Sequence, residues 1–204
     1  FGSMIAMDDP RHARLRRLVS AGFTPRTMQR LEDSVVRVAT EIVDTIAERG
    51  QIDFVADVAA ALPLRIICDM MAVPPERYGF VFERTNVILG AGDPEYVSET
   101  TDVIGAILQA GADLAALMNE VAAARAGGDG DDLTTQLLRA DLDGERLTPA
   151  ELASFFVLLV AAGNETTRNA ISGGLQALIE HPDLWDQLAA DPRLAKDAGE
   201  ECLR

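Results

Sequence analysis

The sequence has only two cysteines, no signal peptide and no apolar run long enough to cross a membrane. Cys68 and Cys202 lie far apart and form no CxxC pair, so a reducing cytoplasm is the expected location. The longest unbroken apolar stretch, residues 155–163, has nine residues, whereas a membrane-spanning helix needs about 20. We therefore expect a cytoplasmic protein without a membrane span.

Basic residues are also scarce relative to acidic ones. The chain has 18 Lys and Arg against 33 Asp and Glu, and its net charge at pH 7 is −15. Nucleic-acid binding depends on Lys and Arg that replace the counterions of phosphates, so this charge argues against a nucleic-acid partner. A cationic partner or a small ligand fits the composition better.

Strand-type alternation of apolar and polar residues is nearly absent, and helical periodicity dominates. With 204 residues, 48% of them hydrophobic, the chain is long enough for one sizeable core. We predict a single all-α unit over residues 1–204. The expected helices cover about residues 10–21, 24–50, 56–72 with a break at Pro63, 74 to 90 or 92, 95–126, 131–140 and 148–180, and two shorter ones end at Arg204. The chain lacks an initiator Met and stops within a helical pattern, so we expect both ends to be cut.

The longest expected helix begins with a capping box. Thr148 is the expected N-cap, Pro149 the first helical residue, and Glu151 the carboxylate that completes the box. Residues 155–162 are apolar on every side, which predicts that this helix runs through the middle of the molecule. A polar segment, residues 163–167, follows directly. A glycine inside a helix costs about 1 kcal/mol relative to alanine, and a buried unpaired carboxylate costs more, so the segment needs an explanation.

Two interpretations of this polar segment are open. The Thr166 hydroxyl can bond to the carbonyl of Ala162, which tends to bend a helix. Together with Gly163 this would form a groove that carries a hydroxyl and a carboxylate, suited to binding a small polar ligand and relaying protons. Alternatively, Glu165 and Thr167 simply face solvent where the helix leaves the core.

A basic motif lies near the N-terminus. His12 and Arg16 are four residues apart, so both can donate to one anion from the same helical face; a solvated basic face is the alternative. Arg11, Arg14 and Arg17 remain as a cationic patch in an acidic chain. This patch either steers an acidic electron donor to the surface or pairs internally with acidic side chains.

Three motifs resemble those of the cytochromes P450, and they occur along the chain in the same order as in that family. Residues 162–167 resemble the oxygen-binding motif of the central helix, and residues 8–12 with 23–26 resemble the haem-propionate motif of bacterial members. Residues 201–204 resemble the Glu-x-x-Arg tetrad, which alone would be an ordinary helical ion pair. The resemblance covers the whole chain, from about the C helix to the start of the K helix. It implies a long, kinked central helix and a chain truncated before the loop that carries the cysteine ligand.

The resemblance implies roles for individual residues. Thr166 would donate to iron-bound dioxygen, and Glu165 would feed protons toward it. The cofactor-binding residues implied are His12 and Arg16 at the haem propionates and Ala162 and Gly163 at the oxygen opening. Glu201 and Arg204 would form a buried structural ion pair.

The implied cofactor is haem b, whose iron the family holds with a cysteine thiolate in a glycine-rich loop. This sequence contains no such loop. Cys68 has the surroundings of a buried small hydrophobe, and Cys202 belongs to the helical tetrad. We therefore assign no metal ligand within the chain and expect that the chain alone neither holds haem normally nor turns over.

Residues 62–71, 85–90 and 163–170 resemble the actinobacterial branch that hydroxylates terminal methyl groups of methyl-branched lipids and sterol side chains. The implied reaction inserts one oxygen atom into an unactivated C–H bond, with electrons from NAD(P)H through ferredoxin reductase and ferredoxin. Leu89 and Gly90 on the lid helix would face the substrate, as would Leu158 and Ala162. Core packing is the alternative for the two leucines.

Two other functions remain open at this point. Within the family, the chain could belong to a hydroxylase of a terpenoid or polyketide intermediate. Outside it, the chain could be a non-enzymatic all-α module that encloses a lipid and docks a partner through its arginine-rich N-terminal helix.

Overall fold

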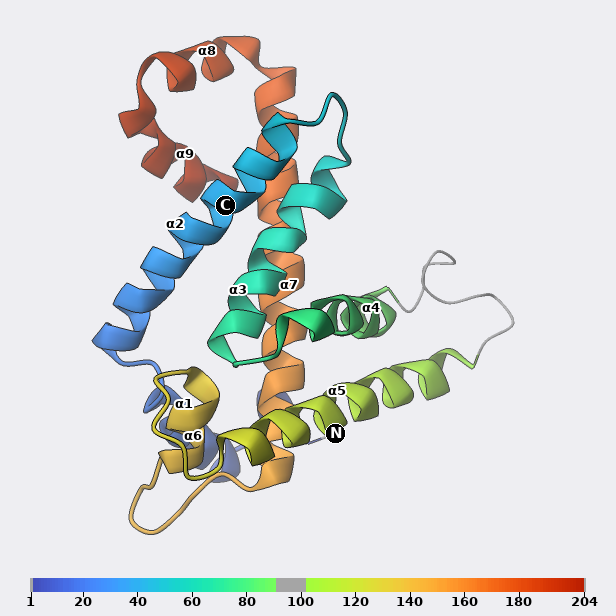
Figure 1. Ribbon diagram of the computed structural model, residues 1–204, viewed down its shortest axis with the longest axis vertical. Coiled ribbons are helices and arrows are strands. Elements are labelled where there is room, and N and C mark those ends of the chain that lie inside the picture. The colour runs from blue at the N-terminus through green and yellow to red at the C-terminus, as the bar shows by residue number, and fades with distance from the viewer. Residues whose placement is uncertain (1, 91–101, 204) are drawn as a thin grey trace.

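The computed structural model describes residues 2–90 and 102–203, and these residues form an all-α structure (Figure 1). The longer helices are α1 (Arg11–Ser20), α2 (Pro25–Ala47), α3 (Ala61–Met70), α4 (Tyr78–Leu89), α5 (Val103–Arg125), α6 (Leu133–Arg139), α7 (Pro149–Glu180), α8 (Pro182–Ala190) and α9 (Ala195–Cys202). Short helical turns are η1 (Met4–Ala6), η2 (Val55–Ala59), η3 (Pro75–Arg77) and η4 (Pro192–Leu194). In the described ranges, β-type pairing is limited to one bridge between Leu142 and Glu145. The predicted all-α class is confirmed.

The long helix α7 is the axis on which the other elements pack (Figure 1). Helices α3, α4 and α5 contact α7 along its length, and α4 and α5 cross it. Helices α1 and α6 lie near its N-terminal end, and α8 and α9 fold back at its C-terminal end. The central position that the all-apolar stretch predicts is therefore confirmed.

The core is formed where α3, α5 and α7 meet. Leu114 and Met118 from α5, Phe156 and Val160 from α7, and Cys68 from α3 are all fully buried. Removing a Leu, Met or Phe side chain from water contributes about 1.5–3 kcal/mol, so this meeting point fixes how the three helices sit.

Two helix starts differ from the sequence prediction. The break near Pro63 exists, but it falls at Ala60, between η2 and α3. Pro63 lies in the first turn of α3, where a backbone N–H has no partner within the helix and its loss costs little. Pro10 is the N-cap residue of α1 rather than its first helical residue. The predicted helix over residues 95–126 is found as α5 from Val103, and residues 95–101 lie outside the described part.

The start of α7 matches the predicted capping box. The Thr148 hydroxyl accepts from the backbone N–H of Glu151 at 3.2 Å, and the Glu151 carboxylate accepts from the N–H of Thr148 at 2.8 Å. A tight turn lies before it, in which Asp143 and Gly144 both have positive φ. Arg14 donates to the same Glu151 carboxylate at 2.8 Å, which ties α1 to the first turn of α7.

We expect the charge of Glu151 to stabilise the fold at neutral pH. Burial raises its pKa, but hydrogen bonds from Thr148 and Arg14 outweigh this and hold the pKa below the ordinary 4.5. A lowered carboxyl pKa contributes stability above the unfolded pKa and loses it as pH falls through the folded pKa. Glu151→Gln should therefore lower the free energy of unfolding by about 1 kcal/mol at pH 7, measured by urea denaturation.

The same comparison below pH 4 provides the check. Gln resembles the protonated acid, so the wild type and Glu151→Gln should converge there. Glu48→Gln, at an exposed position after α2, serves as the control and should change little at either pH. A gap that persists at pH 3 would contradict the electrostatic explanation.

Candidate functional site

Helix α7 has a covered face and an open face. The covered face carries Phe156, Val160 and Asn164, which are at most 1% exposed. Two residues along an α-helix correspond to a rotation of about 200°, so Leu158, Ala162 and Thr166 form a line on the opposite side. Leu158 is half-buried, and Ala162 and Thr166 are exposed. The predicted oxygen-motif residues Ala162 and Thr166 therefore share one accessible stripe.

The Thr166 hydroxyl makes the predicted bond within the helix. Its Oγ1 donates to the carbonyl oxygen of Ala162 at 2.8 Å. Helix α7 continues without interruption through this segment to Glu180, and a bend there stays a prediction. Because the hydroxyl proton points back to the helix, the lone pairs of Oγ1 are left to accept a hydrogen bond from a ligand on the open face.

Glu165 is held from one side only. Its Oε1 atom lies 3.0 Å from Nη2 of Arg168 and accepts from Nδ2 of Asn169 at 3.4 Å. Its Oε2 atom is shielded from solvent and has no hydrogen-bond partner in the part of the chain that the structure describes. The solvent-facing interpretation thus fits Thr167, which is exposed, but fits Glu165 only in part.

Gly163 faces α3 and not the open stripe. A Cβ atom at this position would lie 2.9 Å from Cδ1 of Ile67, closer than real side chains approach. The absence of a side chain at Gly163 therefore lets α3 and α7 pack closely. Of the two residues expected at the oxygen opening, Ala162 alone lies on the open stripe, and Gly163 has a packing role.

The predicted propionate ligands lie on α1. The ring of His12 is half-buried, and its Nδ1 atom is 2.9 Å from the carbonyl oxygen of Met4, which leaves Nε2 for another partner. Arg16 is exposed one turn later. The tie between Arg14 and Glu151 holds α1, and with it both donors, near the N-terminal end of α7.

Comparison with known proteins gives the family context. No family model matches the chain. The chain is 45% identical over 208 residues to a methyl-branched lipid omega-hydroxylase of Mycobacterium tuberculosis. This match covers 100% of this chain and 48% of the relative. The chain is 40% identical over 187 residues to a steroid C26-monooxygenase of Rhodococcus jostii, and this match covers 90% of this chain and 37% of the relative.

Solved structures agree with these relatives. A Mycobacterium marinum cytochrome P450 in complex with pseudoionone superposes with a TM-score of 0.83 and 40% identity, over 93% of this chain and 46% of that one. This chain is a helical part of the cytochrome P450 fold. It spans about half the length of the curated relatives that it matches.

The residues expected on the substrate side of the P450 fold lie outside the core. Leu89 ends α4 with 38% of its surface exposed, and Gly90 follows it as the C-cap. Neither Leu89 nor Leu158 belongs to the buried apolar cluster of the described residues. The structure thus favours an accessible position over core packing for both leucines, and their contact with substrate stays a prediction.

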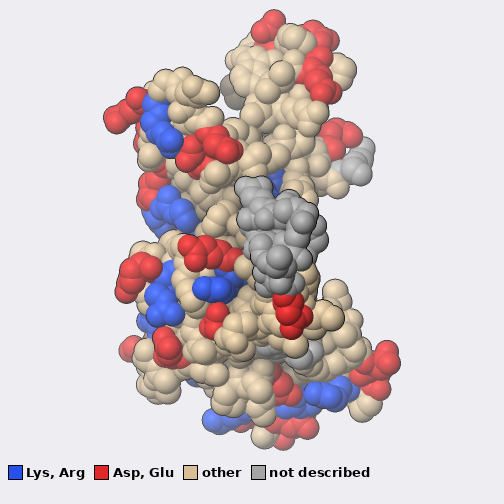
Figure 2. Space-filling model, turned by 90° about the vertical axis from the view of Figure 1, so that its right-hand side faces the viewer, with Lys and Arg blue, Asp and Glu red and all other residues tan. Residues whose placement is uncertain are grey.

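The arginine patch is partly used inside the molecule. Arg14 donates to Glu145 at 2.6 Å, to Glu151 at 2.8 Å and to the carbonyl of Arg146 at 2.9 Å, so the internal-pairing interpretation holds for it. Arg17 is exposed and makes no ion pair with any described residue. Acidic and basic side chains also lie beside each other over much of the face shown in Figure 2.

The two cysteines have structural positions in this part of the P450 fold. Cys68 is fully buried, and burial together with Asp69 raises the pKa of its thiol to about 12, so it stays protonated and unlike a thiolate ligand. Cys202 lies in α9, and its sulfur sits against Gly174 of α7. Glu201 precedes it in α9, while Arg204 lies outside the described residues, so their ion pair stays a prediction.

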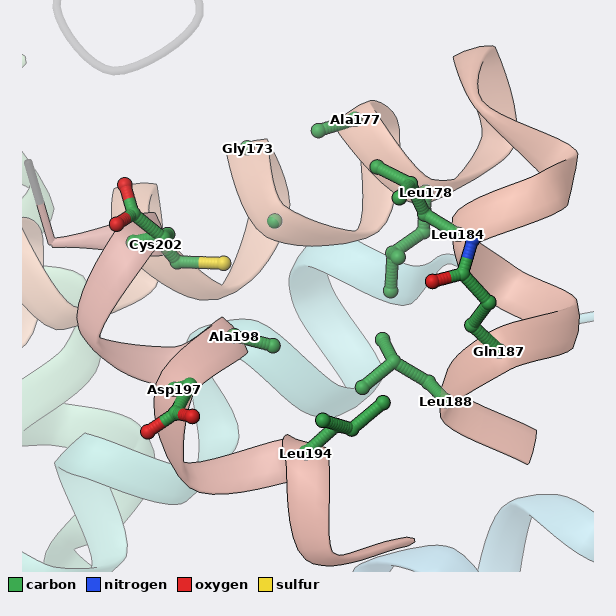
Figure 3. Close-up of a pocket in the computed structure, with 12 residues that line it drawn as sticks. Gly173, Ala177, Leu178, Leu184, Gln187, Leu188, Leu194, Asp197, Ala198 and Cys202 are labelled. Carbon is green, nitrogen blue, oxygen red and sulfur yellow. The ribbon is translucent and has the colours of Figure 1, made fainter. Parts of the chain in front are cut away.

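A separate cavity of about 540 Å³ lies between the C-terminal part of α7 and helices α8 and α9 (Figure 3). Leu178, Leu184 and Leu188 point into it. It begins at Gly173, seven residues or about 10 Å along the helix axis beyond Thr166, so it is distinct from the open stripe. Among the described residues, no helix could span a membrane, and no group of three or more His, Cys, Asp or Glu side chains could hold a metal ion.

We expect the contact between Gly163 and Ile67 to be measurable as a coupling energy. Gly163→Ala gains helix propensity but places a methyl group against Cδ1 of Ile67, and Ile67→Val removes that atom. The alanine should therefore be more favourable by about 1 kcal/mol in the Ile67→Val background than in the wild type. Urea unfolding of the four proteins of this double-mutant cycle measures the difference. Additive effects would show that the two positions do not constrain each other.

Proposed function

We propose that this chain is part of a haem-dependent monooxygenase that hydroxylates the terminal methyl group of a methyl-branched lipid or a sterol side chain. The observation that carries the proposal is the open stripe of Leu158, Ala162 and Thr166 on an otherwise buried helix. The similarity to a methyl-branched lipid omega-hydroxylase and to a steroid C26-monooxygenase supports the substrate class.

The residues present fit a haem group. His12 has one ring nitrogen engaged by Met4 and the other left over, and exposed Arg16 lies on the same face of α1. These two N–H donors suit the pair of propionate carboxylates. When bound, the haem supplies the activation of dioxygen and the oxidising power for C–H insertion. The methyl side chain of Ala162 is small enough to leave room beside the open face of α7.

Residues of α7 and of the end of α4 would supply the proton and the apolar surface for the substrate. Thr166 presents a hydroxyl oxygen on the open face, where it can accept and pass on a proton at Oγ1. Glu165, held by Arg168, is the adjacent acid that can supply that proton. Leu158, Leu89 and Gly90 offer an apolar, uncharged surface, which suits a hydrocarbon chain that must leave water.

Electrons would come from NAD(P)H through a ferredoxin reductase and a ferredoxin, in the cytoplasm. An acidic ferredoxin could approach the arginines of α1 that are not used internally, of which Arg17 is the exposed example. Charge complementarity of this kind mainly increases the association rate. Arg14 is less suited to that role because three of its N–H donors already bond Glu145, Glu151 and the carbonyl of Arg146.

The full-length protein tests the proposal directly. Its reduced, carbon monoxide-treated form should show the absorption band of a thiolate-ligated haem. With ferredoxin, its reductase and NAD(P)H, it should convert a methyl-branched fatty acid or a sterol into the terminal alcohol, detected by mass spectrometry. A protein that takes up no haem would refute the proposal, and an alcohol formed only from terpenoid or polyketide substrates would refute the substrate class.

Replacing Thr166 tests its proposed role in passing a proton to the reacting oxygen. In the full-length enzyme, Thr166→Ala should reduce the product formed per NAD(P)H by about ten-fold or more, because a positioned proton donor typically contributes about 10²–10⁴-fold. The consumption of NAD(P)H itself should continue. Thr167→Ala, one residue further and solvent-exposed, is the matched control and should retain wild-type coupling. Equal coupling in both variants would remove Thr166 from this role.

A further inference from the structure

Asn164 is a fully buried amide without a partner. It lies in the covered face of α7, one turn after Val160, and only 1% of its surface is exposed. Neither its Oδ1 nor its Nδ2 atom has a hydrogen-bond partner within residues 2–90 and 102–203. Since more than 90% of buried polar groups in folded proteins are hydrogen-bonded, this residue requires a specific explanation.

Apolar packing does not explain an asparagine at this position. Leucine has the same number and branching of side-chain heavy atoms, is a better helix former and would extend the apolar face formed by Phe156 and Val160. A buried amide that lacks partners would instead destabilise the fold, because its two polar groups give up water without a replacement. A polar side chain is favoured here only if it binds something polar inside the protein.

The neighbouring buried groups have complementary chemistry. Next to Asn164, the Oε2 atom of Glu165 is shielded from solvent, and no described residue donates to it. The Oε1 atom of the same carboxylate is held by Arg168 at 3.0 Å, which limits how far the carboxylate can rotate. An amide N–H donor and a carboxylate acceptor are thus adjacent on one helix, both cut off from bulk water.

The helix that crosses α7 adds a further polar group. Helix α4 packs on α7 and crosses it (Figure 1). On α4, Thr85 is fully buried, and its hydroxyl has no partner among the described residues. Buried water molecules typically occupy places where two to four such polar groups converge.

We infer that Asn164 binds a buried water molecule that it shares with Glu165. The water accepts a hydrogen bond from Nδ2 of Asn164 and donates one to Oε2 of Glu165; its second proton and Oδ1 of Asn164 remain for a further polar group, such as the Thr85 hydroxyl or a second water. Asn164 is then a positioning residue for the acid beside Thr166. The consequence for proton supply rests on the proposed function, whereas the water site itself does not.

This arrangement gives the two oxygens of Glu165 different environments. Oε1 faces Arg168 and Asn169 toward the outside of the helix, and Oε2 faces the inferred water. The inferred water holds Oε2 and so orients the Glu165 carboxylate beside Thr166, which presents its hydroxyl on the open side. Asn164 holds the water and does not itself exchange a proton.

Crystal structures of the full-length, haem-loaded protein and its Asn164→Leu variant test the water site. The wild type should show a water within about 3.2 Å of both Nδ2 of Asn164 and Oε2 of Glu165. The variant should lack it and should unfold at a temperature lower by about 2–4 °C or more, because Glu165 Oε2 loses its donor. Asn119→Leu, at an exposed position of α5, controls for the change of residue type and should leave the midpoint within 1 °C, roughly the noise expected for a surface substitution.

The opposite results would overturn the inference. A dry site with the Asn164 amide bonded directly to protein atoms, or an Asn164→Leu variant that is more stable than the wild type, would show that no water is held. If Asn164→Leu does not fold, Asn164→Val, which removes the amide with a smaller and uncharged side chain, should show the same loss of the water. These measurements need no turnover, so a protein that shows the water but forms no alcohol would refute the proposed function and leave this inference standing.

Discussion

The two-sidedness of α7 is the constraint on which the rest of this structure depends. A helix of 32 residues in the centre of the molecule must bury one side against α3, α4 and α5, and the residues that do so recur every three or four positions. The opposite side is then set by the same periodicity. Leu158, Ala162 and Thr166 fall on one line there because they are four residues apart, not because they share a chemical character.

Two fixed points hold this central helix in place. At its start, Thr148 and Glu151 satisfy the first backbone N–H groups, and Arg14 joins this cap to α1. Near its middle, the missing side chain of Gly163 lets Ile67 of α3 approach. The first point ties the start of α7 to the basic helix α1, and the second brings α7 close to α3.

Local patterns in the sequence predicted the features that depend on a few neighbouring residues. The capping box and the bond from Thr166 to Ala162 are confirmed because each is decided within five residues. Tertiary contacts were not accessible in the same way. The partners of Arg14 lie more than 130 residues away, and no local signal distinguishes an arginine that pairs internally from one on a docking surface. The family resemblance supplied motif positions but not the direction in which each side chain points.

The segment 162–167 shows why those directions matter. Successive residues of an α-helix point about 100° apart, so six consecutive residues cannot all face one ligand. Ala162 and Thr166 face the open side, Gly163 meets α3, Asn164 enters the core, and Thr167 reaches solvent. Glu165 lies between the core and the open side, with one oxygen toward Arg168 and one shielded. A motif that is read as one unit in sequence is therefore several contacts in space, and Glu165, the fourth of its six residues, stands at the border between the covered and the open face.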